Sequence, residues 1–384
     1  MRPLNIAVVV GVFPAISETF ISNQIDFLKQ SGHKVTILCT RHILKDDSVN
    51  KSKVSQNLVD NALEFNWRAL MPLSKFNRLF SIIKILSKSI FTSGFQVLLK
   101  SLNPFKYRIN AFQGHQFFRT YFTLFFAVND FDIVHIHFGD NAVHLIKQLK
   151  YFDKKVIVTF HGYDAHKYDS KFYNPILQLH SIQYTVNTQF TKQKVINLGF
   201  PEHKINILPV GLDTSFFKPL KKEHSTFNIL FIGRLIELKA PLLTIKIIEK
   251  LIDKKYLDIH LYIIGEGEEQ IICKQYIKNN NLSDFISLLG NKTKLEIRDY
   301  MNQTDVFLFP GITDKTGRSE AQGLVLHEAQ AMELPVLISD VGGMKEGVLD
   351  GETGYVVKAN DIDGFVEKLE FLINNPIFLK KLGE

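Results

Sequence analysis

The sequence predicts an α/β protein made of two domains, each built around a parallel β-sheet. Short apolar runs alternate with amphipathic helical patterns along most of the chain. This alternation is typical of strand–helix–strand units, which form parallel sheets with both faces covered. The pattern runs twice, on either side of a stretch without periodicity between Pro209 and Phe227. A length of 384 residues suits two domains of ordinary size.

The N-terminal domain is predicted to span residues 1–218. Its first helix is expected to begin near Ser17, a favourable N-cap residue, and to place Ile21 and Ile25 on one side. Gly11 is expected to end the first strand and to allow close approach of the backbone to a ligand. The predicted strands are Ile6–Val10, Val35–Cys39, Ile133–His137, Val156–Phe160, Gln183–Val186 and Ile205–Leu208.

A helical insertion at about residues 65–125 is expected in this domain, and its composition is unusual. No acidic residue occurs between Glu64 and Asp130. The interval is rich in Phe, Leu and Ile, and apolar side chains interrupted by basic ones at helical spacing predict a surface that lies on anionic lipid. Nucleic acid would suit the same charge, but no nucleic-acid motif accompanies it, so nucleic acid is not expected as a partner. The outer face of ordinary core helices also fits. The basic residues are Arg68, Lys75, Arg78, Lys84, Lys88, Lys100, Lys106, Arg108 and Arg119.

The C-terminal domain is predicted to span residues 219–384. Pro241 is well placed in the first turn of a helix. Asp361 and Asp363 form a D-x-D pattern, but they open the predicted helix Gly364–Asn374, so capping explains them better than metal binding. The predicted strands are Asn228–Ile232, His260–Ile264, Ile286–Leu288, Val306–Phe309, Val336–Ile338 and Tyr355–Val357.

Two carboxylates in this domain, Glu320 and Glu328, are the most informative residues of the chain. They stand between two strand-like apolar runs, where parallel sheets place their ligands. If the run between them is helical, eight residues separate the acids by about 12 Å along the axis and about 80° around it. Both acids then face one groove, beside helix N–H groups that suit a diphosphate. Either acid alone is more simply explained as a helix-start or surface residue.

With this pattern the chain resembles the retaining glycosyltransferases of family 4, which have the GT-B fold, and in particular the exopolysaccharide and lipopolysaccharide branch that includes colanic-acid-type transferases. The likeness covers nearly the whole chain. Relatives usually continue past the equivalent of Glu384 with a helix that crosses back onto the N-terminal domain. Besides the acidic pair, the likeness rests on Phe13–Phe20 (FPAISETF), His135–Gly139 (HIHFG), Thr159–Asp164 (TFHGYD), Pro209–Asp213 (PVGLD), Phe217–Pro219 (FKP), Ile232–Leu235 (IGRL) with Lys239, and Ile264–Gly267 (IGEG).

The resemblance implies two Rossmann-like domains that face a central cleft, with the acceptor bound by the first and a nucleotide sugar by the second. Arg234 and Lys239 would bind the donor diphosphate. Glu328 would hold ribose hydroxyls, and Glu320 would contact the donor sugar near its reacting carbon. Without the resemblance, a surface ion pair with Glu237 explains Arg234 better.

Further site residues follow from the same resemblance. The N–H groups of Gly323 and Leu324 would contact phosphate, and Asn291, after a strand end, would contact the base. His161 is the catalytic candidate of the first domain, where it would orient a sugar hydroxyl or relay a proton with support from Asp164.

No metal or other cofactor is expected, because Arg234 and Lys239 would take the role of a metal. Zinc binding by the three histidines near the fourth strand is conceivable, but no acid or cysteine completes a usual ligand set. These histidines are His135, His137 and His144.

The expected activity is retaining, metal-independent transfer of a sugar, of the hexosyltransferase class, from a nucleotide diphosphate sugar to a saccharide, with a lipid-linked saccharide as the expected acceptor. A nucleotide-sugar epimerase of the same fold and a non-catalytic sugar-nucleotide-binding protein are the alternatives. Only Cys39 and Cys273 occur, which fits a reducing cytoplasm, and no apolar stretch is suited to span a bilayer. A cytoplasmic protein, peripheral on the inner leaflet of the plasma membrane, is expected.

Overall fold

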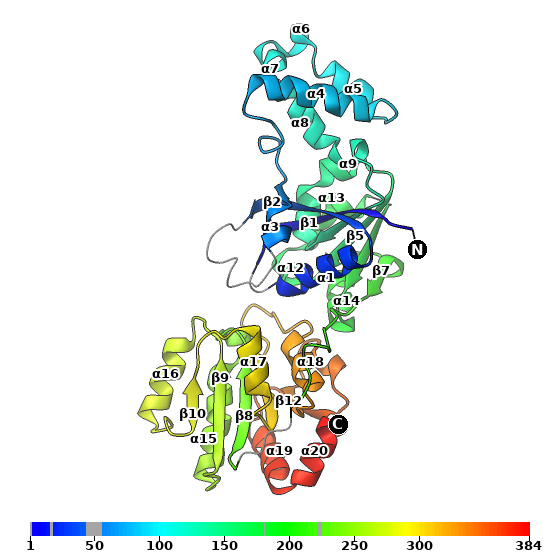
Figure 1. The fold of residues 1–384 in the computed structure, drawn as a ribbon. Coiled ribbons are helices and arrows are strands. Elements are labelled where there is room, and N and C mark those ends of the chain that lie inside the picture. Colours follow the sequence, from blue (N-terminus) through cyan, green and yellow to red (C-terminus); the bar gives the residue numbers. More distant parts are fainter. Residues whose placement is uncertain (1, 16–17, 44–55, 180, 221–224) are drawn as a thin grey trace. The chain divides into compact units, whose positions relative to one another are not determined.

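The computed structural model of the chain describes residues 2–15, 18–43, 56–179, 181–220 and 225–384. These residues form two compact units (Figure 1). The N-terminal unit comprises Met1–Val186 and Lys192–Ile207, and the C-terminal unit comprises Asn187–Thr191 and Leu208–Glu384. No helix in the described ranges is both long and apolar enough to cross a bilayer.

The division after Ile207 lies upstream of the predicted boundary after Lys218. The side chain of Phe217 is 1% exposed and belongs to the hydrophobic core of the C-terminal unit, with Leu212 and Phe216 packed against that core. The residues that follow Ile207 are therefore anchored in the second unit. Their irregular backbone has no apolar periodicity, so the sequence pattern did not reveal this anchoring.

The N-terminal unit contains a parallel sheet. Every paired strand in its described part runs parallel, in the order β3-β2-β1-β4-β5-β6-β7. All six predicted strands are present, and the short β3 was not predicted. The strands are β1 (Asn5–Phe13), β2 (Lys34–Ile43), β3 (Ala62–Glu64), β4 (Ile133–His137), β5 (Lys155–Phe160), β6 (Ile182–Val186) and β7 (Ile205–Ile207).

Helices connect these strands. In the first of them, Ile21 and Ile25 are buried as predicted. The predicted N-cap residue, Ser17, lies outside the described residues, and Glu18 directly precedes the helix. The helices that flank the sheet are α1 (Thr19–Gln30), α3 (Gln56–Asp60), α10 (Gly139–His144), α11 (Ile146–Leu149), α12 (Tyr163–Lys167), α13 (Ser170–Leu177), α14 (Gln189–Asn197) and the 3₁₀ turn η2 (Glu202–Lys204).

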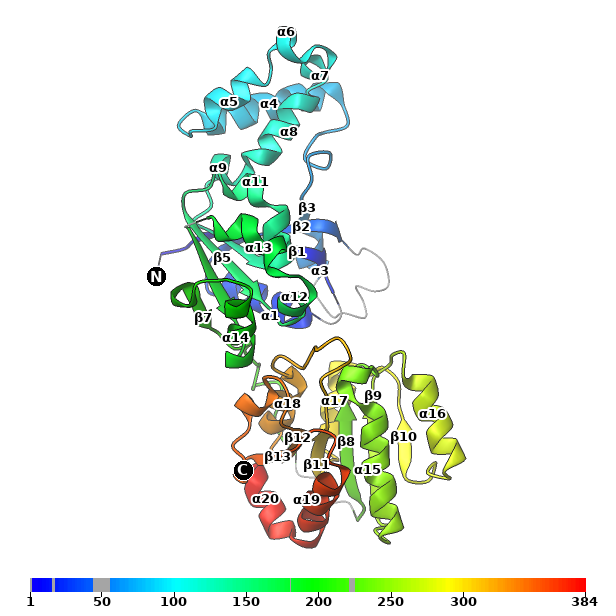
Figure 2. The ribbon, with the colours of Figure 1, turned by 180° about the vertical axis from the view of Figure 1, so that it is seen from behind.

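A further set of helices lies between β3 and β4, in the interval where the helical insertion is predicted. Both ribbon views place α4–α7 at one end of the N-terminal unit, with α8 and α9 between them and the sheet (Figures 1 and 2). Phe117 and Phe118 of α8 are buried in the core shared with the sheet. These helices are α4 (Lys75–Ser89), α5 (Phe95–Lys100), α6 (Pro104–Tyr107), α7 (Ile109–Phe112), α8 (His115–Thr123) and α9 (Phe125–Val128).

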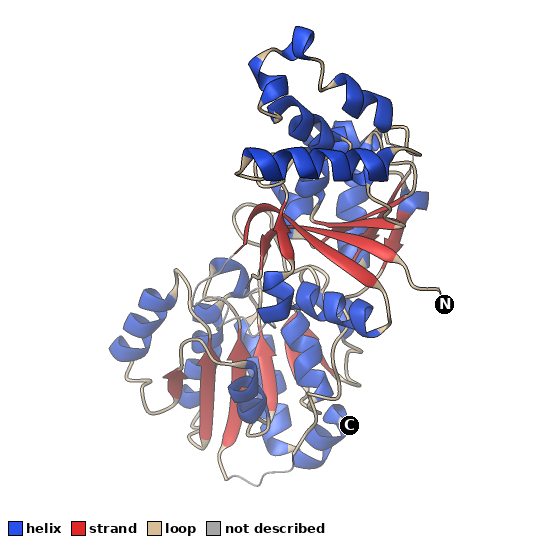
Figure 3. Ribbon diagram, turned by 45° about the horizontal axis from the view of Figure 1, so that its top comes forward, coloured by secondary structure: helices blue, strands red, loops and turns tan. Residues whose placement is uncertain are grey.

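The C-terminal unit is a second parallel sheet, with helices on both of its faces (Figure 3). Among its described residues the strand order is β10-β9-β8-β11-β12-β13, and all six predicted strands are present. They are β8 (Phe227–Ile232), β9 (Ile259–Ile264), β10 (Ile286–Leu288), β11 (Val306–Phe309), β12 (Val336–Ser339) and β13 (Gly354–Val357).

The helices of this unit begin where local signals predict. Pro241 occupies the first turn of α15, and the Asp361 side chain accepts a hydrogen bond from the N–H of Gly364 at the start of α19, as expected for a cap. The helices are η3 (Glu237–Lys239), α15 (Pro241–Asp253), α16 (Gln270–Asn279), α17 (Lys294–Met301), α18 (Leu324–Ala331), η4 (Met344–Gly347), α19 (Ile362–Asn374) and α20 (Pro376–Gly383).

Each sheet has a point at which the strand order reverses. In the N-terminal unit β1 lies between β2 and β4, and in the C-terminal unit β8 lies between β9 and β11. The connections on the two sides of such a strand leave in opposite directions, so ligands of open parallel sheets bind at the carboxyl ends of these strands. A ligand site is therefore expected in the loops after β1 and β4 and in those after β8 and β11.

Candidate functional site

A lysine and a glutamate from two different loops form an ion pair in the C-terminal unit. Lys239 ends η3, in the loop after β8, and its ammonium donates to Oε2 of Glu320, in the loop after β11. Only 14% of the Lys239 side chain and 17% of the Glu320 side chain are exposed. The ammonium also lies 5.0 Å from the ring centroid of Phe309, the last residue of β11. The loops after the two strands at the reversal point therefore meet through a cation and an acid.

The environment of Glu320 favours its ionised form. Burial raises the pKa of this carboxyl, but the charge and hydrogen bond of Lys239, the backbone N–H of Gly323 and the charge of Arg234 outweigh burial and lower it. Arg234 itself is exposed. Within the described ranges no ion pair joins it to Glu237, which instead lies 3.9 Å from the ammonium of Lys315. Arg234 thus adds positive potential at Glu320, and no carboxylate in the described part of the chain forms an ion pair with it.

Two glycines in the loop after β12 fix the backbone around Glu320. The N–H of Gly343 donates to the Glu320 carbonyl oxygen at 2.9 Å. A Cβ atom at Gly343 would lie 1.9 Å from the carbonyl oxygen of Ala321, and one at Gly342, whose φ is +66°, would lie 2.1 Å from that of Glu320. Side chains do not fit at either position. The loop that carries Glu320 therefore rests directly on the backbone of the neighbouring loop.

The helix that follows is shorter than the expected helical run. α18 begins at Leu324, and Gly323 before it has a left-handed backbone with φ of 69°. Glu320 consequently precedes the helix, and the expectation of a continuous helix from Glu320 to Glu328 is wrong. Gly323 tolerates this conformation because it has no Cβ. Its N–H is directed at the Glu320 carboxylate.

Glu328 differs from Glu320 in its electrostatics. It lies half-buried on α18, where burial raises its pKa to about 7 while the charge of Lys294 opposes the rise. Lys294 begins α17, and its ammonium lies 4.4 Å from the ring centroid of Phe216. The two acids therefore have pKa values shifted in opposite directions, which gives them different protonation at neutral pH.

Hydrogen bonds connect the loops that follow β8, β9 and β10. The N–H of Leu235 donates to the carbonyl of Glu266, and the N–H of Gly265 donates to the carbonyl of Gly290, at 3.0 and 2.9 Å. The amide of Asn291 donates to the Glu266 carboxylate at 2.7 Å. Asn291 is thus connected to the loop of Arg234 through Glu266. No role for Glu266 was predicted, although the position of its Gly-Glu-Gly segment after a strand was a usable signal.

In the N-terminal unit, His161 follows β5 and bonds to a second histidine. Its Nε2 lies 3.0 Å from Nδ1 of His137, the last residue of β4. The two rings are stacked at an interplanar angle of 19°. Phe20 and Phe138 pack against His161, with ring centroids at 4.8 and 4.7 Å. His137 is buried, as expected for a residue of the core or cleft wall, but its bond to His161 was not predicted.

Burial keeps both histidines neutral. It lowers the pKa of His161 to about 3, with a further contribution from His135, and it lowers the pKa of His137 well below its ordinary value. Nε2 of His137 is buried and has no partner in the described structure. A buried N–H without a partner is costlier than a bare acceptor. Hydrogen-bond satisfaction therefore assigns the shared proton to Nδ1 of His137, which gives His161 an N–H donor at Nδ1 that no described residue accepts.

Asp164 supports His161 through the backbone and not through the ring. Its Oδ1 accepts from the N–H of His161 at 2.9 Å and its Oδ2 from the N–H of Gly139 at 2.7 Å. Burial raises the pKa of Asp164 to about 7, and the two backbone hydrogen bonds oppose the rise. The carboxyl ties the loop after β5 to the loop after β4, so it positions His161.

Gly11 does not end the first strand. β1 continues to Phe13, with a register shift between Val10 and Val12. A Cβ atom at Gly11 would lie 2.0 Å from a guanidinium nitrogen of Arg41, so the absent side chain makes room for Arg41. The prediction that Gly11 ends the strand is wrong, because the pattern showed the apolar run but not the residue from β2 that covers it.

Three charged groups gather at this end of the N-terminal sheet and were not predicted. Burial raises the pKa of Glu18 to about 7, while Arg41 opposes the rise and Asp140 adds to it. Arg41 stands two positions after the predicted strand Val35–Cys39, which was an available signal. The carboxyl ends of β1, β2 and β4 therefore carry both signs of charge.

In each unit, therefore, some of the predicted site residues lie together. In the N-terminal unit these are His161 and Asp164. Arg234, Lys239 and Glu320 belong together, with Gly323 and Leu324 directly after them in the chain. Among the residues that the structure describes, no group of three or more His, Cys, Asp or Glu side chains is arranged to hold a metal ion. His135, His137 and His144 thus form no such group.

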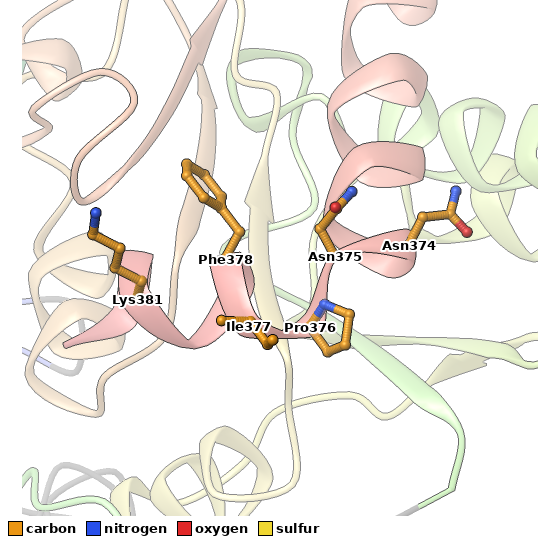
Figure 4. A pocket seen from close by; sticks show the side chains of 6 residues that line it. All are labelled: Asn374, Asn375, Pro376, Ile377, Phe378 and Lys381. Carbon is orange, nitrogen blue, oxygen red and sulfur yellow. The ribbon is translucent and has the colours of Figure 1, made fainter.

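A pocket in the C-terminal unit lies at the turn between α19 and α20, apart from these groups (Figure 4). Its walls are mainly apolar and amide side chains, and Lys381 is its single ionisable residue, so nothing in it suggests chemistry. The lining residues are Asn374, Asn375, Pro376, Ile377, Phe378 and Lys381.

Comparison with known proteins identifies the two halves of the chain. A model of glycosyltransferase family 4 matches residues 17–216, and a model of glycosyl transferases group 1 matches residues 213–384. An amylovoran biosynthesis glycosyltransferase of Erwinia amylovora is 25% identical over 91% of this chain and 86% of its own. A putative colanic acid biosynthesis glycosyltransferase of Escherichia coli is 24% identical over 93% and 87%. The crystal structure of Anabaena HepE in complex with UDP shares the fold, with a TM-score of 0.68, 13% identity, and coverage of 99% of this chain and 93% of that one.

Proposed function

The chain belongs to glycosyltransferase family 4 and is a GT-B glycosyltransferase with a group 1 C-terminal domain, and we propose that it transfers a sugar from a nucleotide diphosphate sugar to a saccharide of a surface polysaccharide. The names of the amylovoran and colanic acid relatives support the polysaccharide. The UDP bound to the Anabaena neighbour supports a nucleotide donor. The observation that carries the proposal is the Lys239–Glu320 pair at the strand-order reversal of the C-terminal sheet.

In the proposed complex the donor diphosphate lies against the positive groups of the C-terminal unit. Lys239 and Arg234 would neutralise the charge that grows on the diphosphate as the bond to the sugar breaks. The N–H of Leu324 would add a phosphate contact at the start of α18, and the N–H of Gly323 would add another when it turns from the Glu320 carboxylate to the phosphate. Diphosphate oxygens would compete with Glu320 for the Lys239 ammonium, which frees the Glu320 carboxylate to accept from the donor sugar near its reacting carbon.

The remaining predicted residues would bind the nucleoside and the sugar of the donor. Glu328 would accept from the two ribose hydroxyls, and Asn291 would contact the base from the loop after β10. His161, with its free Nδ1–H, would hold a sugar hydroxyl in the N-terminal unit. The backbone near Gly11 lies at the same end of the N-terminal sheet as His161.

The proposed reaction retains the anomeric configuration of the donor. The bond between C1 and the phosphate oxygen breaks, the acceptor oxygen bonds to C1 on the same face, and the acceptor proton passes to the leaving phosphate. No metal takes part, because Lys239 and Arg234 provide the positive charge. The acceptor is proposed to be a lipid-linked saccharide, which places the enzyme in the cytoplasm at the inner leaflet of the plasma membrane.

The assay that tests the function incubates the purified chain with nucleotide sugars and acceptor, with and without EDTA. We expect a glycoside with the same anomeric configuration as the donor, seen by NMR, at an unchanged rate in EDTA. A product of inverted configuration would contradict retention, and loss of activity that Mg²⁺ restores would contradict metal independence. Donor that is epimerised without acceptor, or bound but never turned over, would identify the two alternatives, neither of which the comparisons favour.

Donor affinity is expected to depend on pH through Glu328. Its raised pKa, about 7, means that the unliganded carboxyl gains its charge as pH rises through neutrality. Only the carboxylate accepts from both ribose hydroxyls, so affinity should rise by about tenfold between pH 6 and pH 8 and then level off.

The Glu328→Gln variant is the control, because Glu18 and Asp164 also have pKa values raised to about 7. We expect this variant to bind the donor about tenfold more weakly at pH 8 and with little dependence on pH. Calorimetric titrations across the range measure both effects. A pH dependence that persists unchanged in Glu328→Gln would assign it to another group.

A further inference from the structure

Helix α4 carries an apolar stripe that no described residue of the N-terminal unit covers. Successive residues of a helix turn by about 100°, which places Phe76, Leu79, Phe80 and Ile83 within an arc of about 100°. All four side chains are exposed, Phe76 by 79% and Phe80 by 66%. We call these four residues the α4 stripe.

The face of α4 that adjoins the stripe on one side is the one that packs on the unit. Ile82, Ile85 and Leu86 are partly buried against the N-terminal core, and Ser89 is fully buried. Arg78 lies on the same side and donates to the backbone carbonyls of Pro72, Leu73 and Gln113. The orientation of the helix is therefore fixed by its inner face, and the exposure of the stripe is not the result of a loosely attached helix.

Further large apolar side chains are exposed around the stripe. They lie in the segments that adjoin α4 and in the short helices α6 and α7, which both ribbon views place at the same end of the unit as α4 (Figures 1 and 2). Phe91, just after α4, is fully exposed. The others are Leu73, Ile90, Phe105, Ile109 and Phe112.

The charges in these helices all have one sign. No acidic residue occurs between Glu64 and Asp130. On the same helical geometry Lys75 lies about 40° beyond one edge of the α4 stripe and Lys84 about 40° beyond the other, and Lys88 lies one turn after Lys84 on the same side, about 80° from that edge. Exposed apolar side chains bordered by lysines are the composition with which helices lie in the plane of an anionic membrane.

We propose that α4, together with α6 and α7, is a docking surface for an anionic lipid bilayer, with the α4 stripe inserted among the acyl chains and the lysines at the level of the phosphates. A second copy of this face would bring like charges together, which disfavours self-association. A nucleic acid would pair with the lysines but would leave the aliphatic side chains of the stripe in water. The proposal rests on the proposed function in one respect: a lipid-linked acceptor would require the enzyme to work at a membrane surface.

Cosedimentation of the full chain with vesicles tests the docking without turnover. We expect binding to vesicles of phosphatidylcholine mixed with phosphatidylglycerol, and at least about tenfold weaker binding to pure phosphatidylcholine. Phe76→Ser, Phe80→Ser and Ile83→Ser combined should weaken binding to the mixed vesicles by about 100-fold. Lys84→Glu with Lys88→Glu should weaken it by at least about tenfold.

Helix α16 of the C-terminal unit offers matched controls. Ile271 and Ile272 are exposed by 69% and 51%, and Lys274 and Lys278 are exposed on the same helix. Ile271→Ser with Ile272→Ser, and Lys274→Glu with Lys278→Glu, should leave vesicle binding unchanged. Equal effects of the α4 and α16 variants would overturn the proposal.

Two other results would also overturn it. One is absence of binding to the mixed vesicles, and the other is a wild-type dimer in solution that the α4 variants convert to a monomer. Donor binding by the α4 variants, measured by calorimetry, should match that of the wild type. Failure of docking therefore leaves the proposed transfer untouched, and failure of transfer leaves the vesicle result valid.

Discussion

Replacing Lys239 with methionine is expected to reduce sugar transfer at saturating donor by about 10²–10³-fold. The ammonium is held in a mostly buried position by Glu320 and lies above the Phe309 ring, so it is oriented before the diphosphate departs. Methionine keeps most of the volume of the side chain and removes the charge. Steady-state kinetics with nucleotide sugar and acceptor measures the effect.

The same substitution should also lower stability, and a double variant separates the two consequences. Without Lys239 the Glu320 carboxylate lacks its partner, which costs about 2–3 kcal/mol, less than for a fully buried pair because both side chains are partly exposed. Adding Glu320→Gln should restore the melting temperature but not the transfer rate. Recovery of both would show that Lys239 is only structural. Lys246→Met on α15, whose ammonium lies over the Tyr276 ring, is the matched control and should leave transfer unchanged.

Replacing His161 with alanine is expected to lower the transfer rate by about 10²-fold or more while the donor affinity changes little. His161 lies in the N-terminal unit, whereas the residues assigned to the diphosphate lie in the C-terminal unit. Burial lowers the pKa of His161 to about 3, so its ring is neutral and offers a hydrogen bond, not a charge. Comparison of kcat with donor Kd from calorimetry measures the two effects separately.

The protonation of the histidine pair gives this prediction a sharper form. If the Nδ1–H of His161 holds a sugar hydroxyl, His161→Asn, which also carries an N–H donor, should recover part of the lost rate. No change in the rate between pH 5 and pH 8 should trace to His161, since a group with so low a pKa does not titrate there. An acidic limb in the pH–rate profile that disappears in His161→Ala would instead show a histidine that is charged in the working enzyme.

The fold followed closely from patterns of apolar residues. β4 ends in His137 and β5 is followed directly by His161, and the bounds of both strands were predicted to within a residue. β3 was missed because its sequence, Ala-Leu-Glu, carries no strand pattern and its pairing depends on β2. The division between the units was placed too late, because Phe217 reaches its core without any periodic sequence around it.

The site was predictable as a set of residue types but not as a set of contacts. Lys239 and Glu320 are 81 positions apart, and their pairing depends on which loops the sheet order brings together. The helical geometry proposed between the two acids failed because Gly323 was read as part of a helix, although glycine also favours the left-handed conformation that precedes one here. Arg41 over Gly11 and His137 beside His161 are contacts across neighbouring strands, which a pattern within one strand does not contain.

Calorimetric titration of the full chain with UDP, GDP and ADP tests most directly whether the C-terminal unit holds a nucleoside diphosphate between its cations and its acids. We expect one of the three to bind in a one-to-one complex, and binding to weaken by about tenfold or more in both Lys239→Met and Glu328→Gln, while Lys246→Met binds like the wild type. Absence of binding by all three nucleotides, or equal affinity in the wild type and both site variants, would contradict the placement of the donor.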